Sequence, residues 1–478
     1  MTEHYSILIA GGKSSGIHNV TSPYDGRIIG TVDTANAESI EQALNTADRL
    51  YQDRSKWLPG EKRIEVLEKT AAIMQERFDY LAVEAAREGG KPLIDSRVEV
   101  TRAIDGIRNC AELLRHETGN EIAMGVNPAS SGRLAFTHRE AIGVVVAISA
   151  FNHPLNLIVH QVGPAVAAGC PVIIKPAGDT PLSCMRLISI LHEAGLPAEW
   201  AQACVVDNTD TAEKLATDPR VAFFSFIGSA KIGWMLRSKL APGTRCALEH
   251  GGVAPVIIAP DADLDDALPL IAKAGFYHAG QVCVSVQRVY APADLAERIA
   301  RRIADLGSQM QIGDPTLDNT DIGPLIRPAE VQRVDQWVND AVSDGARLLC
   351  GGTPVSETCY PATVLLDPPD SSTISQSEIF GPVICVYSCT DMDEAMQRAN
   401  SLPYSFQSAV FTGSLDTAMW AYRQLDASAV MVNDHTAFRV DWMPFAGRRV
   451  SGYGTGGIPY TYRDMTIEKM LVIRSKEI

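Results

Sequence analysis

The stretch Gly143–Ile148 reads Gly-Val-Val-Val-Ala-Ile, and Ser149–Pro154 continues it as Ser-Ala-Phe-Asn-His-Pro. An apolar, β-branched run of this length is typical of a strand that is buried on both of its faces. Pro154 favours the first turn of a helix, so a helix is expected directly after this strand. The stretch therefore predicts one strand–helix unit of an α/β fold.

The same alternation of short apolar runs and helical segments continues along the chain. Four further strands are expected, at Val172–Lys175, Ala203–Val206, Val221–Phe226 and Cys246–Glu249. Helices are expected after Pro154, Pro181, Thr209 and Ser229. This order predicts a parallel, doubly wound sheet, which binds ligands at the carboxyl ends of its strands. The residues expected to converge at those ends are Asn152, Lys175, Gly228 and Glu249.

Helical patterns precede this region, and a second α/β unit follows it. Apolar residues recur at spacings of three and four from Ile64 to Leu81, which predicts one long helix that Gly89 and Gly90 end. Another helix is expected at Arg97–His116. The second unit has expected strands at Ser285–Ala291, Val383–Tyr387, Ala409–Thr412 and Val430–Asn433. Its expected helices are Leu295–Leu306, Ala329–Ser343 and Asp393–Ala399.

Length, charge and hydropathy exclude several classes of protein. A chain of 478 residues with 46% hydrophobic content is too long for one simple core, so two or three domains are expected. The net charge of −15 repels phosphate backbones and anionic membranes, so we expect no nucleic-acid and no membrane partner. The start Met1–His4 lacks the pattern of a signal peptide, and no apolar run is long enough to span a bilayer.

The ten cysteines show no CxxC pair and no Cys/His cluster. Most of them lie in apolar runs and are expected to be small buried hydrophobic residues. Free thiols of this kind are typical of a cytoplasmic protein. No metal site is expected.

Three residues at the ends of different elements carry candidate chemistry. Taken alone, Cys283 would usually be a buried hydrophobic residue, Glu249 a solvated turn residue, and Asn152 a helix cap. Together they offer a thiol nucleophile, a carboxylate base and an amide that can hold an oxyanion. Covalent oxidation of an aldehyde needs these three groups.

Seven short segments carry a resemblance to a known family. The segments are Phe151–Pro154, Lys175–Ala177, Phe226–Ser229, Leu248–Gly252, Gly280–Cys283, Glu378–Pro382 and Pro444–Gly447. Each segment alone is weak, but their order and spacing resemble those of the aldehyde dehydrogenase superfamily over nearly the whole chain. The segment Asn433–Asp441 resembles the lactaldehyde and succinate-semialdehyde dehydrogenase-like branch.

The resemblance implies a division of the chain and a role for each catalytic residue. It implies a cofactor-binding domain at 1–122 and 142–249, a catalytic domain at 250–445, and a small β oligomerisation element at 123–141 and 446–478. Cys283 would form a thiohemiacetal and then a thioester with the aldehyde. Asn152 and the Cys283 N–H would stabilise the oxyanion, and Glu249 would activate the hydrolytic water.

The resemblance also implies NAD or NADP as the cofactor. Gly178 stands where NAD-preferring members carry Glu, and a carboxylate there would repel a 2′-phosphate, so NADP is tolerated. His250 replaces a usual Leu and is expected beside the crevice without a catalytic role. The expected cofactor residues are Ile148, Ser149, Ala150, Phe151, Lys175, Ala177, Gly178, Phe226, Gly228, Ser229, His250, Glu378 and Phe380.

The substrate is expected to be a small hydroxy- or carboxy-aldehyde. Val282 stands where relatives that take phosphorylated aldehydes carry Arg, which argues against such substrates. Arg102 and Arg439 could bind a carboxylate. His153 and His160 are as consistent with structural roles as with substrate contacts. The candidate substrate residues are therefore Arg102, His153, His160, Val282 and Arg439.

Two alternatives and one assembly state stay open. A coenzyme A-acylating semialdehyde dehydrogenase is disfavoured by Glu249, because transfer to a thiol needs no such base. A catalytically silent member of the family, with a binding or structural role, is disfavoured because Cys283, Glu249 and Asn152 are all present.

The β-like segments Arg133–Arg139 and Met470–Arg474 could pair with each other or with another subunit. Their exposed edges would need covering, so a homodimer or homotetramer is expected.

Overall fold

The computed structural model describes residues 3–478, so Met1 and Thr2 of the start considered for a signal peptide lie outside it. A first sheet has the strand order β21-β11-β10-β6-β7-β8 and is parallel except for β21, which pairs antiparallel with β11. Its strands are β6 (Val144–Ile148), β7 (Val172–Lys175), β8 (Ala201–Ala203), β10 (Val221–Ile227), β11 (Arg245–Glu249) and β21 (Gly452–Tyr453). Four of the five predicted strands of the first unit are therefore present in this sheet, and of the fifth, expected at 203–206, only Ala203 lies in it.

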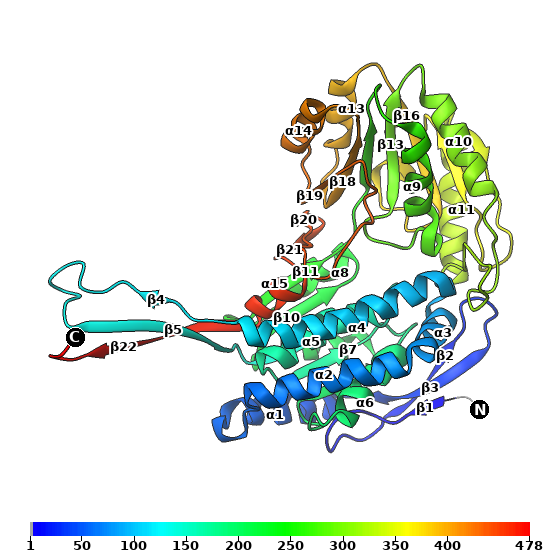
Figure 1. Cartoon of the computed structure of the whole chain (residues 1–478). Coiled ribbons are helices and arrows are strands. Elements are labelled where there is room, and N and C mark those ends of the chain that lie inside the picture. The colour runs from blue at the N-terminus through cyan, green and yellow to red at the C-terminus, as the bar shows by residue number, and fades with distance from the viewer. Residues whose placement is uncertain (1–2) are drawn as a thin grey trace.

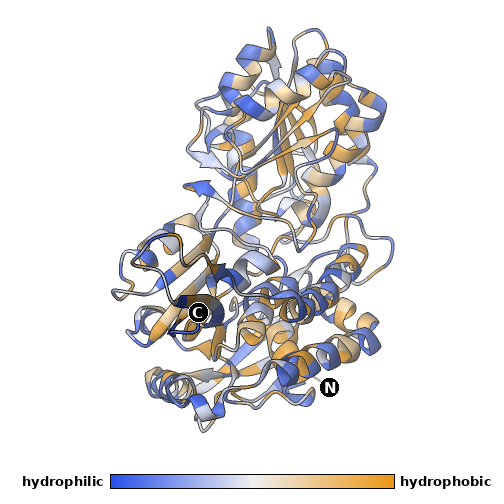
Figure 2. Ribbon diagram, turned by 60° about the vertical axis from the view of Figure 1, so that its left-hand side comes forward, coloured by the Kyte–Doolittle hydropathy of each residue, from blue (hydrophilic) through white to orange (hydrophobic). Residues whose placement is uncertain are grey.

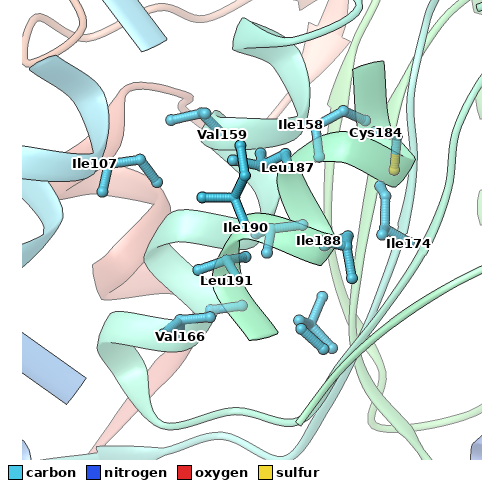
Figure 3. Close-up of a cluster of buried hydrophobic side chains, with 14 of the residues drawn as sticks. Ile107, Ile158, Val159, Val166, Ile174, Cys184, Leu187, Ile188, Ile190 and Leu191 are labelled. Carbon is cyan, nitrogen blue, oxygen red and sulfur yellow. The ribbon is translucent and has the colours of Figure 1, made fainter. Parts of the chain in front are cut away.

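Helices cover both faces of this sheet, because its central strands are apolar on both sides. On β6, Val145 and Ala147 belong to one core, whereas Val144 and Val146 belong to another. Figure 3 shows the first of these cores, where Ile107, Val159 and Leu187 from three helices meet. The helices of that face are α2 (Gly60–Glu76), α3 (Phe78–Gly89), α4 (Leu93–His116), α5 (Asn156–Ala168) and α6 (Leu182–Glu193). The opposite face carries α1 (Ala37–Gln52), α7 (Thr209–Thr217) and α8 (Ala230–Arg237).

A second sheet of seven strands forms the upper body in Figure 1, in the order β14-β15-β16-β13-β12-β18-β19. Its strands are β12 (Ala254–Ile258), β13 (Val286–Pro292), β14 (Arg347–Cys350), β15 (Thr363–Leu366), β16 (Val383–Cys389), β18 (Gln407–Phe411) and β19 (Ala429–Val432). Its helices are α9 (Leu264–Phe276), α10 (Ala296–Ser308), α11 (Pro328–Ser343), α12 (Thr373–Gln376), α13 (Met392–Ala399) and α14 (Leu415–Gln424). In Figure 2 the strands of both bodies are mostly hydrophobic, while hydrophilic residues line the outer sides of the helices. The α/β class with parallel sheets is thus confirmed.

A long two-stranded arm projects from the molecule and carries the C-terminus at its end (Figure 1). In it β5 (Arg133–Ala141) pairs antiparallel with β22 (Thr466–Arg474) over their whole length, and β4 (Glu121–Ile122) extends the sheet. The predicted pairing of the two β-like segments with each other is confirmed. The short helix α15 (Ile458–Asp464) precedes β22 and packs on α4 and α5.

The single long helix predicted from Ile64 to Leu81 is wrong. The chain forms α2 and α3 instead, with a break at Arg77, whose φ of −101° and ψ of 19° leave the helical region. Both helices keep their apolar faces on the same core, so the spacing of apolar residues continues across the break. A periodic pattern reports the buried face and not the continuity of the backbone.

Several short strands were not predicted. Pro255 lies inside β12, and a proline normally argues against a central strand, but a register shift between Ala254 and Pro255 accommodates it. The expected strand at 203–206 is two strands, of which β9 (Val205–Val206) joins an N-terminal sheet through β3. That sheet has β1 (Glu3–Tyr5), β2 (Gly16–Thr21) and β3 (Ile28–Ala35). The remaining short elements are η1 (Arg54–Lys56), η2 (Tyr277–Gly280), β17 (Tyr404–Ser405) and β20 (Arg448–Arg449).

The ten cysteines all lie in the described part of the chain and are free, as expected. Over residues 3–478, no helix is both long and apolar enough to cross a membrane. No group of three or more His, Cys, Asp or Glu in the same range could hold a metal ion. The cytoplasmic location and the domain boundaries stay predictions.

Candidate active site

A cavity of about 400 Å³ lies where the first sheet's strand ends meet the loops of the second unit. Cys283, Glu249 and Asn152 all line it, although they come from three separate parts of the chain. The apolar lining includes Phe151, Phe226 and Phe445. Of the four residues expected to converge at the carboxyl ends of the strands, Asn152, Gly228 and Glu249 line the cavity and Lys175 does not.

The loop that carries Cys283 is held in an unusual backbone conformation. After α9 the chain passes through His278 and Ala279, whose φ angles of 50° and 51° lie in the left-handed region. Such a conformation costs on the order of 1–3 kcal/mol at each non-glycine residue, so the surroundings must hold it in place. Gly280 has a φ of 68°, and a Cβ there would lie 2.0 Å from the Gly381 oxygen. The chain can make this turn only with glycine at position 280.

The side chain of Gln281 supplies much of that support. Its Nε2 donates to the carbonyl oxygens of His278 and Pro324, each at 3.2 Å. Its Oε1 accepts from the Ile326 N–H at 2.9 Å. Gln281 is 1% exposed, so these bonds are shielded from water. They fix the residue two positions before the thiol.

Burial and charge set the state of the Cys283 thiol. Burial raises the pKa of Cys283 well above its usual value, and the charge of Glu249 raises it further. The guanidinium of Arg439 acts in the opposite direction on the same pKa. The thiol is therefore protonated in this state, and its attack on a carbonyl needs a group that accepts the proton.

Glu249 is the last residue of β11 and projects into the cavity from the strand end. Burial raises the pKa of its carboxyl group, while Arg439 and Arg102 hold that increase back. The guanidinium of Arg439 lies close to it, with Nη1 at 3.9 Å from Glu249 Oε1. A buried carboxylate with a raised pKa is a better proton acceptor than a solvated one, so the position suits a general base.

Asn152 does not cap the following helix. Glu99 of α4 performs that task, because its Oε1 accepts from the Leu155 and Asn156 N–H groups at 2.9 Å each. The Asn152 amide instead donates to the Gln281 carbonyl oxygen at 2.9 Å and is 6% exposed. One N–H therefore anchors the side chain to the Cys283 loop, and the amide lines the cavity beside the thiol. The helix-cap alternative is excluded.

One side of the cavity has the features of a dinucleotide site. Gly178 has open space around its Cβ position, and Gly228 directly follows β10 and precedes α8. Glu378 Oε1 is buried without a hydrogen-bond partner, and burial raises the pKa of this carboxyl to about 8. A Cβ on Gly251 would lie 1.8 Å from that oxygen, so glycine at 251 makes room for the Glu378 carboxylate. Phe380 adopts a φ of 48°, a strained value typical of ligand sites.

The other side of the cavity carries two arginines. Arg102 of α4 and Arg439 both line it, and the side chain of Arg439 is 9% exposed. The guanidinium of Arg439 lies over the Phe445 ring at 3.5 Å from its centroid. Arg102 binds Asp441 with both Nε and Nη2, at 3.2 and 2.6 Å. Arg102 and Arg439 therefore bring positive charge to the cavity wall beside Asp441 and Glu249 respectively.

A model of a known protein family matches nearly the whole chain. The model described as "Aldehyde dehydrogenase family" matches residues 10–471. The chain belongs to the aldehyde dehydrogenase family. It is an NAD(P)-dependent aldehyde dehydrogenase, and other solved members of this family that match it carry NADP. The resemblance predicted from seven segments is confirmed.

Two named relatives and one solved structure are similar to the dehydrogenase over nearly its whole length. It is 35% identical to a 3-sulfolactaldehyde dehydrogenase of Priestia aryabhattai, with 95% of this chain and 94% of that protein covered. It is 32% identical to a lactaldehyde dehydrogenase of Methanocaldococcus jannaschii, with 95% and 97% covered. The structure of aldehyde dehydrogenase 21 from Physcomitrella patens, in complex with the reaction product succinate, superimposes with a TM-score of 0.94 at 32% identity and 99% coverage of both chains.

Most of the predicted site residues of the dehydrogenase line this one cavity. Two do not. Lys175 ends β7, and its Nζ donates to the Pro176 carbonyl oxygen at 3.1 Å. His160 lies behind Arg439 and bonds to Asp441 at 2.7 Å. The predicted residues in the lining are Cys283, Glu249, Asn152, Ile148, Ser149, Ala150, Phe151, Ala177, Gly178, Phe226, Gly228, Ser229, His250, Glu378, Phe380, Arg102, His153, Val282 and Arg439.

The structure also brings to the site residues that were not predicted. Tyr277, Asn156 and Phe445 line the cavity, and Asp441 lies behind it. Tyr277 lies close in sequence to Cys283, and Asn156 lies close in sequence to Asn152. This closeness was the only signal in the sequence that could have indicated them. Arg288 is buried outside the cavity lining and donates to the Val253 carbonyl oxygen.

Proposed function

We propose that this dehydrogenase oxidises a small aldehyde with a hydroxyl or anionic group to the corresponding carboxylate, with a thioester on Cys283 as the intermediate. The observation that carries the proposal is one buried cavity that holds the thiol, the carboxylate of Glu249 and the amide of Asn152, with two guanidinium groups at one end. The relative named for sulfolactaldehyde and the similar structure with succinate support an anionic substrate.

The residues act in sequence on one carbon atom. Cys283 Sγ forms a bond to the carbonyl carbon, its proton passes to solvent, and the new oxyanion accepts hydrogen bonds from Asn152 Nδ2 and the Cys283 N–H. NAD(P)⁺, when bound, would supply the acceptor for the hydride that leaves this carbon as the thioester forms. Glu249 then takes a proton from water as the water oxygen bonds to the thioester carbon. The carbon–sulfur bond breaks, the carboxylic acid is released and loses its proton to solvent, and the Cys283 thiolate regains a proton from Glu249.

We propose that the dinucleotide side of the cavity holds the cofactor. The unpartnered oxygen of Glu378 would accept from ribose hydroxyl groups, and Phe380 would pack beside the nicotinamide end. Gly228 and Ser229 would leave room for the pyrophosphate at the start of α8. The further residues proposed for this side are Ile148, Ser149, Ala150, Phe151, Lys175, Ala177, Gly178, Phe226 and His250.

A panel assay tests the proposed function. Reduced-nicotinamide formation is measured with NAD and NADP in parallel, over aldehydes that include lactaldehyde, succinate semialdehyde and propionaldehyde, each with and without coenzyme A. We expect turnover that needs no coenzyme A and favours the anionic aldehyde. Turnover only with coenzyme A would overturn the hydrolytic assignment to Glu249, and no turnover with any aldehyde would overturn the proposed activity.

Asn152→Ala is expected to lower kcat by on the order of 10²- to 10³-fold, because one oxyanion donor contributes about 3 kcal/mol to transition-state stabilisation. KM changes little, since the ground-state aldehyde oxygen carries less charge. Steady-state kinetics measure both constants. Asn109→Ala on α4, where the amide bonds to Asp105, is the control and keeps wild-type kcat. A loss below fivefold for Asn152→Ala would contradict the oxyanion role.

Arg439→Gln is expected to raise KM for succinate semialdehyde by about tenfold to a hundredfold, because a buried charge-assisted hydrogen bond contributes roughly 1.5–3 kcal/mol. Propionaldehyde, which carries no anionic group, is the internal control and changes much less. The ratio of the two kcat/KM values measures the effect. A similar loss for both aldehydes would show that Arg439 does not recognise the anionic end.

We propose that the arm formed by β5 and β22 is an oligomerisation element and that the enzyme is a homodimer or homotetramer. Leu134, Phe136, Leu471 and Ile473 are 37–47% exposed, and the strand register pairs Phe136 with Leu471 and Leu134 with Ile473. An uncovered apolar strand face of this kind marks a contact surface. Light scattering should give a multiple of 51.6 kDa. The double variant Phe136→Lys/Leu471→Glu should give the monomer mass, and a monomeric wild-type protein would overturn the proposal.

A further inference from the structure

Two of the three arginines that line the cavity, Arg102 and Arg439, are connected through one buried carboxylate. Asp441 is 1% exposed, and its Oδ1 accepts from Arg102 Nη2 at 2.6 Å, His160 Nε2 at 2.7 Å and Asn156 Nδ2 at 3.3 Å. Its Oδ2 accepts from Arg102 Nε at 3.2 Å. Burial alone would raise the pKa of Asp441, but the bond from His160 and the charge of Arg102 hold it well below its usual value. Asp441 is therefore ionised, and it fixes the plane of the Arg102 guanidinium through two bonds.

His160 passes this constraint to Arg439. Because ionised Asp441 can only accept, the His160 proton lies on Nε2, and Nδ1 is left as an acceptor. Nδ1 lies 3.4 Å from Arg439 Nη2, which can only donate. Burial lowers the pKa of His160 to about 4, so the ring is neutral at pH 7 and keeps this tautomer. The chain Asp441–His160–Arg439 has one consistent set of donors and acceptors.

Arg439 has few other polar partners. Its Nε is buried without a hydrogen bond, and its flat face lies on the Phe445 ring. The carboxylate of Glu249 lies 3.9 Å from Nη1, whereas His160 is the partner of Nη2. Without His160 the guanidinium would have only the Glu249 carboxylate to turn towards. The bond to His160 thus keeps Arg439 in place for a substrate anion and away from a close pair with the proposed base.

We propose that Asp441 and His160 are positioning residues for the anionic end of the substrate, Asp441 acting directly on Arg102 and, through His160, on Arg439. This inference rests on the proposed function. Neither residue lines the main cavity, so both act through the two arginines and not by contact with the aldehyde. The pair decides which aldehydes are bound tightly, while the reacting carbon stays with Cys283, Glu249 and Asn152.

Kinetics of His160→Leu and His160→Gln, with succinate semialdehyde and propionaldehyde, test the proposal. Leu removes both bonds, and we expect KM for succinate semialdehyde to rise about tenfold, with a much smaller change for propionaldehyde. The Gln amide offers one donor and one acceptor, so His160→Gln should recover most of the lost preference. His192→Gln is the control. His192 also lies on a helix and makes a hydrogen bond, to the Ala201 carbonyl oxygen, but it lies outside the cavity lining.

Asp441→Asn provides a second, independent variant if a substitution at His160 prevents folding. It keeps the shape of the side chain but removes its charge, and we expect a larger rise in KM for succinate semialdehyde than in His160→Leu. Equal losses for both aldehydes, without recovery in His160→Gln, would reveal a purely structural role and overturn the proposal. An unchanged anionic preference in His160→Leu and Asp441→Asn would also overturn it. A wild-type enzyme without any anionic preference would instead overturn the proposed substrate class on which it rests.

Discussion

Cys283→Ser is expected to lower kcat by at least about 10⁴-fold, the largest effect of any single substitution in this chain. A serine hydroxyl keeps the size of the side chain but is a far weaker nucleophile and a poorer leaving group from the acyl intermediate. The thiol is half-buried in a loop held by Gly280 and Gln281, so the substitution should not disturb the fold. Steady-state reduced-nicotinamide formation with the best aldehyde of the panel measures the loss.

Cys246→Ser is the matched control for this prediction. Cys246 is also half-buried and free, and it lies on the same strand, β11, as Glu249, but it does not line the cavity. We expect its kcat to stay within about twofold of the wild type, as for most substitutions away from a site. If Cys283→Ser kept more than a tenth of wild-type kcat, the covalent mechanism would be wrong.

Glu249→Gln is expected to lower steady-state kcat by about 10²- to 10⁴-fold, the range for loss of a general base. Gln keeps the shape of the side chain but cannot take a proton from water, so hydrolysis of the thioester stops. Because the thiol proton passes to solvent and Glu249 is needed only for hydrolysis, the first turnover still proceeds and gives a burst of about one reduced nicotinamide per active site. Rapid mixing separates this burst from the slow steady phase.

In the wild-type enzyme, kcat should depend on pH through the ionisation of Glu249. Burial raises the pKa of Glu249 above the usual value of a glutamate carboxyl. The base is active only when it is ionised, so the hydrolysis rate is full above the raised pKa and falls as the pH drops through it. The acid limb of the kcat profile should disappear in Glu249→Gln. A profile that keeps the same acid limb in this variant would assign the titration to another group.

Much of the fold could be predicted because its strands are apolar on both faces. Every residue of β6 is buried, so an unbroken β-branched run marked it in the sequence. The break at Arg77 was invisible because α2 and α3 bury their faces against one core. β12 was missed because Pro255 normally argues against a central strand, and only its register shift in three dimensions removes the conflict.

The catalytic trio could be predicted because each member lies in a short segment with glycine or proline around it. Gly251 and Gly280 are required by close contacts, with the Glu378 carboxylate and the Gly381 carbonyl oxygen respectively. Asp441 could not be predicted, because its partner Arg102 is 339 positions away and nothing local links the two residues. His160 was placed on the substrate side from its helix position, whereas the role proposed for it depends on contacts with that distant segment.

The central claim is that Cys283 carries the substrate's acyl group between oxidation and hydrolysis. Intact-protein mass spectrometry of Glu249→Gln, quenched in acid after incubation with succinate semialdehyde and NADP, tests it most directly. We expect an added succinyl group on the peptide that contains Cys283. The group should be absent when NADP is left out, and absent in the double variant Glu249→Gln/Cys283→Ser. An unmodified protein under conditions that release one equivalent of reduced nicotinamide, or an adduct on another residue, would contradict it.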